Sequence, residues 1–174
     1  ARQAIIADDG WTISDGGLLD FSRDAFVTTW QTTAANESIT IPTLGGGYNF
    51  QIDWGDGTPV ETITGNDPDP SHTYATAGAY AVSITGTFPR IFLDAGRFGN
   101  GDPTNAEKLQ SIDQWGTIQW STMYAAFSGA TNMTYAATDA PDLSSVTEMN
   151  NMFNDATSFN GAIGGWDVSN VRQM

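Results

Sequence analysis

The sequence has no cysteine, and lysine and histidine occur once each, as Lys108 and His72. Without cysteine the chain can form no disulfide, no thiolate nucleophile and no cysteine-ligated zinc site. Cytosolic proteins and exported bacterial proteins can both lack cysteine. This absence therefore excludes several chemistries but leaves the cellular compartment open.

Basic residues are scarce as well: six Lys and Arg stand against twenty Asp and Glu, giving a net charge of −14. Nucleic acids and anionic membranes both require cationic contacts, so this charge argues against either as a partner. An acidic, solvated surface is the simplest interpretation, and cation binding is the alternative. No run approaches the roughly 20 apolar residues of a membrane span, so no membrane insertion is expected.

What the sequence does contain is abundant Gly, Thr, Ser, Asn and Asp, a composition typical of turns and short strands. Its 174 residues suffice for one ordinary domain or two small ones. The chain opens with Ala1 and no signal peptide, as a mature or excised segment would. Nine Phe and six Trp can supply a core.

Residues 25–93 carry the alternation of β-strands. Apolar residues recur at every second position in 48–54 and again in 80–84, the pattern of half-buried strands. Gly55-Asp56-Gly57 separates two such segments as a hairpin-type turn would. Strands are expected at 26–30, 39–41, 48–54, 60–64, 72–74, 80–84 and 91–93. Seven short strands with frequent turns favour a β-sandwich.

A repeat occupies the last third of the chain. Residues 123–131, MYAAFSGAT, align with 149–157, MNNMFNDAT, at an offset of 26 residues. Trp115, Pro141 and Trp166 occupy equivalent places, and we name the units that begin there A, B and C. A period of this length indicates stacked supersecondary units, each covering the apolar face of its neighbour. Phe127 and Phe153 should therefore stack on one another.

Each unit is expected to be a short extended segment, then about two helical turns, then a loop. Met149, Met152, Phe153 and Ala156 stand at i, i+3, i+4 and i+7, which is one face of a helix. Met174 would be the first helical position of unit C, which suggests a truncated array with further repeats of the same chain beyond it.

Four segments follow from these patterns. Residues 1–22 are expected to form a helix, turn and strand that dock either on the β region or on a preceding array of which they are the end, since they could not fold alone. Residues 23–93 form the β-sandwich, 94–108 a connecting loop rich in Gly and Pro, and 109–174 the repeat array.

Two resemblances support this division. DWGDGT (53–58) and SHTYATAGAYAVSITG (71–86) resemble a polycystic-kidney-disease-type (PKD-like) domain, an immunoglobulin-like β-sandwich. LQSIDQWGTIQWSTMYAAFSGA (109–130), LSSVTEMNNMFNDATSFNG (143–161) and WDVSNVRQM (166–174) resemble the BspA-like bacterial surface proteins, which carry leucine-rich-type repeats of 25–26 residues. The resemblance implies a mainly β chain with short helices: an immunoglobulin-like β-sandwich followed by an α/β leucine-rich-type repeat solenoid.

The resemblance also implies a function. It suggests an extracellular or cell-surface bacterial protein that is not an enzyme and that binds protein or glycan on a cell or matrix surface through the solenoid. Two alternatives remain open. The segment could be a structural stalk without a ligand of its own, or an accessory carbohydrate-binding unit of a larger protein.

Trp115, Trp120 and Trp166 are the candidate ligand-binding residues. Exposed together, they could form an aromatic platform for a sugar or an apolar stripe for a protein partner. Their equivalent places in the repeat favour packing between units instead. The carbohydrate-binding alternative requires Trp115 or Trp166 to be exposed. Ser144, Ser169 and Asn170 are expected to bond neighbouring backbone along the stack rather than a ligand.

Asp53, Asp56, Asp67 and Asp69 are candidate calcium ligands, although no cofactor is required by any pattern in the chain. Carboxylate and carbonyl oxygens suit calcium, and these residues bracket loops that could share one end of the sandwich. No EF-hand pattern is present, and simple turn formation explains the same residues.

His72 follows Ser71 directly, and a catalytic dyad between them is conceivable. No pattern in the sequence places an orienting acid beside such a pair. The position of His72 at the start of a strand indicates a structural hydrogen bond instead, and no catalytic residue is assigned.

Overall fold

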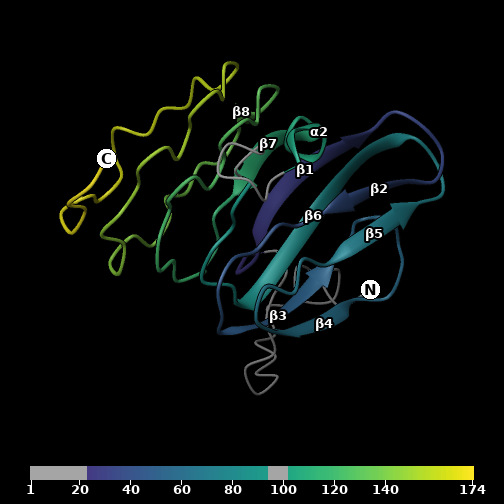
Figure 1. Ribbon diagram of the computed structural model, residues 1–174, viewed down its shortest axis with the longest axis horizontal. Helices are drawn as coiled ribbons and strands as arrows, with labels where there is room; N and C mark the ends of the chain where they lie inside the picture. The colour runs from purple at the N-terminus through teal and green to yellow at the C-terminus, as the bar shows by residue number, and fades with distance from the viewer. Residues whose placement is uncertain (1–22, 94–101) are drawn as a thin grey trace, which may run out of the picture.

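The computed structural model describes residues 23–93 and 102–174, and over these ranges the protein is mainly β (Figure 1). The expected helix–turn–strand of residues 1–22 lies outside the described residues. The strands are β1 Phe26–Thr32, β2 Glu37–Thr40, β3 Tyr48–Asp53, β4 Glu61–Gly65, β5 Ser71–Tyr74, β6 Gly78–Thr87, β7 Leu109–Gln114 and β8 Thr134–Tyr135. One short helix, α2, spans Pro103–Ala106.

The strands form two sheets. The larger has the order β4-β3-β6-β1-β7-β8, and the smaller pairs β2 with β5. All pairs are antiparallel except β7–β8, which is parallel. Both sheets contribute side chains to one apolar cluster, for example Trp30 from β1 and Ile39 from β2. The mainly β character expected from the sequence is thus confirmed.

Period-2 patterning explains the central strand. Along β1, Phe26, Thr28, Trp30 and Thr32 are buried while the residues between them are partly exposed. The buried face needs apolar bulk, and burying one large aromatic side chain stabilises the fold by about 1.5–3 kcal/mol. The buried Thr28 hydroxyl accepts a hydrogen bond from the Trp30 indole N–H at 2.8 Å, so neither polar group is left unpartnered.

The β region and the repeat region share a sheet and a core. β7, which lies within the predicted repeat array, pairs with β1. The Trp115 ring stacks on Phe26 with centroids 5.5 Å apart. Gly116 has φ +62°, and a Cβ there would collide with the carbonyl oxygens of Asp24 and Ala25. The two regions are therefore joined by ladder bonds and close packing.

Units A and B lie side by side, as the green and yellow parts of the chain show (Figure 1). The amides of Ala125, Phe127 and Gly129 donate to the carbonyls of Asn150, Met152 and Asn154, at 2.8–2.9 Å. The amides of the alternate residues 126, 128 and 130 donate instead to the carbonyl three positions earlier in the same unit. Successive turns, each bonded sideways to the next unit, therefore build this part of the chain.

The expected helical turns in these units are wrong, since residues 123–130 and 149–156 form turns and not helix. The reason is a repeated left-handed backbone. Ala125 has φ 51° and its equivalent Asn151 has φ 59°, while Gly129 has φ 78° and its equivalent Asp155 has φ 58°. A left-handed residue at every fourth position interrupts an α-helix, and this frees alternate amides to bond to the neighbouring unit.

The expected stacking of Phe127 on Phe153 is confirmed, with ring centroids 5.9 Å apart and planes at 13°. Trp115 also meets Trp166, its equivalent two units further on, edge to face with centroids 5.4 Å apart. The Phe127–Phe153 pair carries the single-unit register. The 26-residue register seen in the sequence is therefore a physical register of side chains.

One smaller expectation is wrong. Residues 91–93 are buried but lie in no strand, because Phe92 and Leu93 donate to Pro42 and Ala126 rather than to a strand partner. The expected connecting loop contains α2, which begins with Pro103 after Asp102. The Asp102 side chain accepts the amide of Thr104 at 2.9 Å, as an N-cap does. Residues 94–101 of this loop lie outside the described residues.

Candidate binding surfaces

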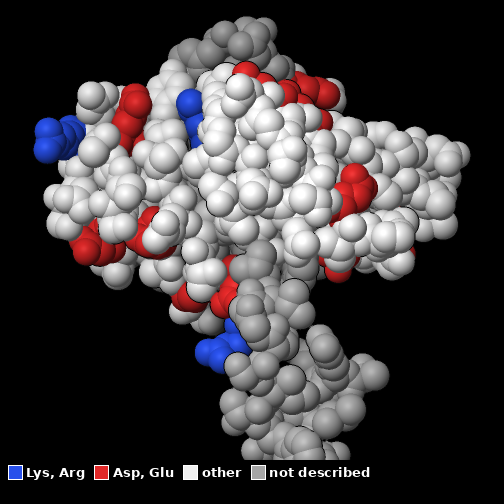
Figure 2. Space-filling view, turned by 90° about the horizontal axis from the view of Figure 1, so that it is seen from below, with Lys and Arg blue, Asp and Glu red and all other residues white. Residues whose placement is uncertain are grey.

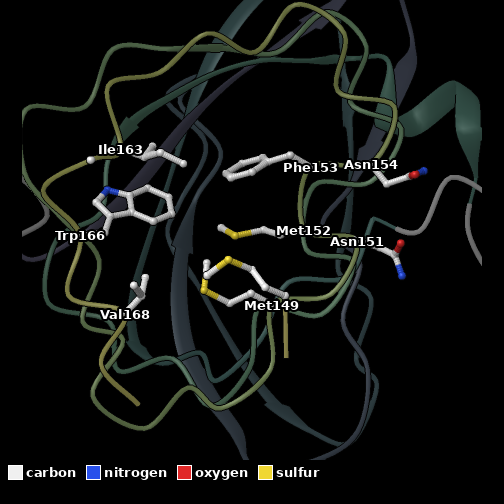
Figure 3. Close-up of a pocket in the computed structure, with 10 residues that line it drawn as sticks. Met149, Asn151, Met152, Phe153, Asn154, Ile163, Trp166 and Val168 are labelled. Atoms are coloured by element: carbon white, nitrogen blue, oxygen red, sulfur yellow. The ribbon is translucent and has the colours of Figure 1, made fainter. Parts of the chain in front are cut away.

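The repeat region contains an apolar hollow of about 640 Å³. Its lining residues come from units B and C and are mostly apolar: Met149, Met152, Phe153, Ile163, Trp166, Val168 and Met174, with Asn151, Asn154 and Gly164 at the rim. Figure 3 shows Met149, Met152 and Phe153 on one side facing Ile163, Trp166 and Val168 on the other. The Asn151 and Asn154 side chains point away from the hollow (Figure 3). We name this surface the end face.

Exposure rises from unit A to the end face at equivalent positions. Met123 and Trp115 are fully buried, whereas their equivalents Met149 and Trp166 are 8% and 9% exposed. Phe127 is likewise fully buried, while its equivalent Phe153 is partly exposed. The apolar pattern that unit B covers on unit A is thus left open on unit B itself.

A second surface runs along one side of units B and C, and we name it the polar edge. Its residues are exposed at matching positions of both units: Ser144 with Ser169, Ser145 with Asn170, and Thr147 with Arg172. The Arg172 amide donates to the Thr147 carbonyl at 2.9 Å, which holds the two rows side by side. The Asn170 amide group donates to the Ser144 carbonyl at 2.9 Å, as expected of a residue that bonds along the stack.

Each row of the polar edge is fixed by an aspartate. Asp142 Oδ1 accepts the Ser144 amide at 3.0 Å, and Asp167 Oδ1 accepts the Ser169 amide at the same distance. Hydrogen bonds from Ser144 and Ser169 lower the pKa of the respective aspartate below its ordinary value. Both carboxylates therefore stay charged near neutral pH and hold their turns in the same shape.

Acidic side chains are spread over the face shown in Figure 2, with few basic ones among them. This arrangement agrees with the net charge of −14. One of the few basic side chains, Lys108, pairs with Glu37 at 3.1 Å. The hydrogen bonds that Glu37 receives from Thr33 and Lys108 lower its pKa to about 2. Sequence reasoning did not identify this pair, because its residues lie far apart in the chain.

The three candidate tryptophans do not form a surface platform. Trp115 and Trp120 are fully buried where the β region meets unit A, with their rings edge to face at 5.8 Å. Trp166 is 9% exposed and contributes one wall of the end face. Neither Trp115 nor Trp120 presents a ring face to solvent, so both side chains pack in the core.

The four candidate calcium ligands are engaged in turns. Asp53 accepts the Gly55 amide, Asp56 accepts the Thr58 amide and hydroxyl, and Asp69 accepts the Thr43 amide and hydroxyl. Asp67 has φ 43°, and its amide donates to the Gly45 carbonyl. Within residues 23–93 and 102–174, no group of three or more acidic or histidine side chains is arranged to hold a metal ion.

His72 fastens the turn after β3 to strand β5. Its Nε2 lies 2.8 Å from Asp56 Oδ2, and its ring stacks on Trp54 with centroids 5.1 Å apart. Burial raises the pKa of Asp56, but hydrogen bonds from Thr58 and His72 outweigh that effect and lower the pKa to about 2. The expected structural hydrogen bond of the histidine is therefore confirmed.

The conceivable dyad between His72 and Ser71 is not formed. Neighbouring residues of a strand point to opposite faces, and both lie within β5. The Ser71 hydroxyl instead accepts a hydrogen bond from Thr40 at 3.0 Å. The serine therefore has no base beside it.

Sequence reasoning also missed most of the end face. Among its residues, only Trp166 was proposed as ligand-binding. Met149, Met152 and Phe153 were expected only on one helix face, and Ile163 and Val168 were not singled out. The alignment of unit B on unit A contained the necessary signal. An apolar residue that is buried in unit A has an apolar equivalent in unit B, and that equivalent must be either exposed or covered by another segment. The sequence did not predict the loop conformation that places Ile163 opposite Phe153.

Comparison with known families matches residues 90–174 to the family described as "Mycoplasma protein of unknown function, DUF285". The matched segment contains all of the repeat region and the residues that lead into it. Comparison with curated proteins and with solved structures finds no match to the chain. No helix in the described part of the chain is long and apolar enough to cross a membrane.

Proposed function

We propose that this chain is a non-enzymatic recognition module of a bacterial cell-surface or secreted protein. In this proposal, an immunoglobulin-like, PKD-like sandwich serves as spacer, and a leucine-rich-type solenoid like that of the BspA-like proteins binds a protein or glycan on a cell or matrix surface. The similarity of residues 90–174 to a repeat-containing family of unknown function is compatible with this proposal and assigns no activity to it.

The observation that carries the proposal is the polar edge. Hydroxyl, amide and guanidinium side chains stand at matching exposed positions of units B and C, and backbone hydrogen bonds fix their spacing. A rigid surface of polar groups loses little entropy on binding and can donate and accept hydrogen bonds with a glycan or a peptide. Ser145 and Thr147 are exposed on this edge and serve as its representatives.

Within residues 23–93 and 102–174, the residues considered for catalysis make structural hydrogen bonds. The one histidine is bonded to Asp56, and the adjacent serine faces the other side of its strand. The stalk alternative has the same rigid geometry but predicts no ligand. The carbohydrate-binding alternative based on an exposed Trp115 gains no support, because that side chain is fully buried.

Binding of the purified chain to a glycan array and to immobilised host-cell surface proteins tests the proposal. Ser145→Arg together with Thr147→Arg should lower any specific binding at least tenfold, because two long cations would obstruct the edge. The matched control is Thr62→Arg with Thr64→Arg, two exposed positions on β4. If the wild-type chain binds nothing in either assay, or both pairs reduce binding equally, recognition by the polar edge is wrong.

A further inference from the structure

Another hollow, of about 460 Å³, lies where the β region meets the repeat region, and we name it the junction pocket. Its lining residues are Gln31 and Thr33 at the end of β1, Thr104 from α2, Glu107, Lys108 and Gln110 where the chain enters β7, and Asn132 from unit A. We propose that the junction pocket binds a small organic cation through a primary ammonium group. The pocket shares no residue with the polar edge, so this inference stands whether or not that edge binds a ligand.

Three side-chain amides of the pocket are oriented by the main chain. The Gln31 amide group donates to the carbonyl of the next residue at 2.6 Å, and the Gln110 amide group donates to two main-chain carbonyls at 3.2 and 3.3 Å. The Asn132 amide group donates to the Glu107 carbonyl at 2.8 Å. Because the nitrogen end of each amide is held in this way, its oxygen end is left as an acceptor. None of the three oxygens accepts a hydrogen bond from residues 23–93 or 102–174.

Two hydroxyls and a carboxylate of the lining add further acceptors. The Thr104 hydroxyl donates its proton to Asp102 Oδ1 at 2.7 Å, and the Thr33 hydroxyl donates its proton to Glu37 Oε2 at 3.3 Å. Each hydroxyl can therefore only accept a hydrogen bond from a ligand. The exposed Glu107 carboxylate receives no hydrogen bond from the described part of the chain. Every lining residue except Lys108 thus offers a free acceptor.

Lys108 is the one cationic residue of the lining, and its charge is already compensated. Its ammonium group lies 3.1 Å from the Glu37 carboxylate and donates to the Ser38 carbonyl at 2.8 Å. Hydrogen bonds from Thr33 and Lys108 lower the pKa of Glu37 to about 2, so that carboxylate is charged at neutral pH. The Glu107 carboxylate has no such cationic partner, and the pocket therefore carries an excess of negative charge.

An excess of acceptors beside an uncompensated carboxylate favours a ligand that donates hydrogen bonds and carries positive charge. A primary ammonium group has three donors and no acceptor, whereas a sugar hydroxyl brings acceptor lone pairs with its donor. Hydrogen bonds between charged groups are also stronger than neutral ones. Because hydrogen bonds already hold the amides and Lys108, little side-chain entropy is lost on binding. Small-molecule sites have volumes of about 300–1,000 Å³, so a polyamine or an amino sugar fits this pocket in both size and chemistry.

Titration of the purified chain with butylammonium, followed by NMR of the side-chain amides, tests the proposal. We expect saturable binding with a dissociation constant of about 1 mM, and the largest shifts at Gln31, Gln110 and Asn132. Tetramethylammonium has the same charge but no N–H, and it should bind roughly tenfold more weakly or not at all. Glucosamine should likewise bind roughly tenfold more tightly than glucose. Comparing the affinities of glucosamine and putrescine then distinguishes an amino sugar from a polyamine as the source of the ammonium group.

Two variants and one control place the binding in the pocket. Glu107→Gln keeps the size of the side chain but removes its charge, and it should weaken butylammonium binding by roughly tenfold. Gln31→Leu removes one acceptor and should weaken binding by roughly threefold. Asp67→Asn is the matched control, because it removes one charge from the exposed loop between β4 and β5, and it should leave binding unchanged.

Several results would overturn the proposal. Binding that does not saturate, or equal weakening by Glu107→Gln and Asp67→Asn, would show that butylammonium only screens an acidic surface. Equal binding of glucose and glucosamine would make this a hydroxyl site. Displacement of butylammonium by a lower concentration of calcium would assign the pocket to a metal ion.

Discussion

The β region and the repeat region satisfy their backbones in different ways. In the β region, β1 and β6 pair through seven consecutive residues, and side chains alternate between core and surface. In the repeat region, only β7 and β8 are strands, and alternate amides divide between a turn in their own unit and the next unit. Regular secondary structure is therefore one of two routes by which this chain buries its polar backbone.

The difference has a consequence for stability. Each strand of the β region pairs with a neighbouring strand of the same chain. Each repeat unit instead depends on the adjacent unit for partners of its alternate amides and for cover of its apolar face. Unit A has the β region on one side and unit B on the other. Unit B contacts unit A on one side and bonds to Gln173 of unit C on the other. Equivalent residues in units A and B should therefore contribute different amounts to the free energy of unfolding.

The largest effect is expected where the two regions meet. Trp115→Ala removes a fully buried ring that contacts Phe26, Trp120 and Phe127, and should cost about 3–5 kcal/mol of unfolding free energy. Because this ring belongs to the core of both regions, both should unfold in one transition at lower denaturant. Chemical denaturation followed by fluorescence and by circular dichroism checks this, and two separated transitions in the wild-type chain would contradict it.

Next in size is the difference between equivalent phenylalanines. Phe127→Ala should cost about 3–4 kcal/mol, since the ring is fully buried between unit A and unit B. Phe153→Ala at the partly exposed end face should cost less than half of that, because solvent already reaches the ring. Equal losses in denaturation experiments would show that the end face is as well covered as unit A.

A smaller effect is expected from one hydroxyl in the β region. Tyr74→Phe removes the bond from the Tyr74 hydroxyl to the Trp54 carbonyl at 2.9 Å and should cost about 1–2 kcal/mol. Burial raises the pKa of Tyr74 well above its ordinary value, so the hydroxyl remains a donor at all accessible pH. The loss should therefore be the same at pH 7 and pH 9, and a loss that disappears at pH 9 would argue against this bond.

The left-handed backbone of the repeat gives a further test. Asn151→Ala should cost about 1 kcal/mol, because alanine tolerates φ 59° less well than asparagine does. Asn151→Gly is the matched variant and should be nearly neutral, since glycine adopts this conformation freely. Thermal unfolding of both variants distinguishes the two causes. Backbone strain destabilises only the alanine variant, whereas a lost side-chain contact would destabilise both variants equally.

The smallest effect concerns Asp56, whose pKa is lowered from 3.8 to about 2 in the folded chain. A carboxyl with a depressed folded pKa adds stability above its unfolded pKa and loses it as pH falls, here between about pH 4 and pH 2. Because the turn is solvent-accessible, the contribution should be below about 1 kcal/mol. Asp56→Asn should flatten the loss of unfolding free energy over this range.

Much of the fold was predictable from particular residues. Six of the seven strands expected in residues 25–93 are present, because apolar alternation at positions such as Tyr48, Phe50 and Ile52 fits only one face of a strand. The stacking of Phe127 on Phe153 followed from one alignment offset. The pairing of His72 with a structural partner was also foreseen, although its identity, Asp56, was not.

What failed were predictions that used local spacing alone. The i, i+3, i+4 pattern at Met149, Met152 and Phe153 is shared by a helix and by successive turns, and left-handed φ at Asn151 and Asp155 decides between them. The tryptophans were correctly placed in the repeat, but their exposure depends on which surface meets the β region. Among the candidate calcium ligands, Asp53 and Asp56 accept from amides two residues further on, whereas Asp69 accepts from Thr43, a partner that local spacing could not indicate.

The sequence by itself determined the register: a 26-residue offset dictates which side chains meet, because an apolar pattern that recurs can be buried only against its own copy. Tertiary structure alone decided that β7 joins β1 and that Trp115 and Trp120 are buried where the β region meets unit A. Those outcomes depend on contacts between residues far apart in the chain, whose free energies no local pattern encodes.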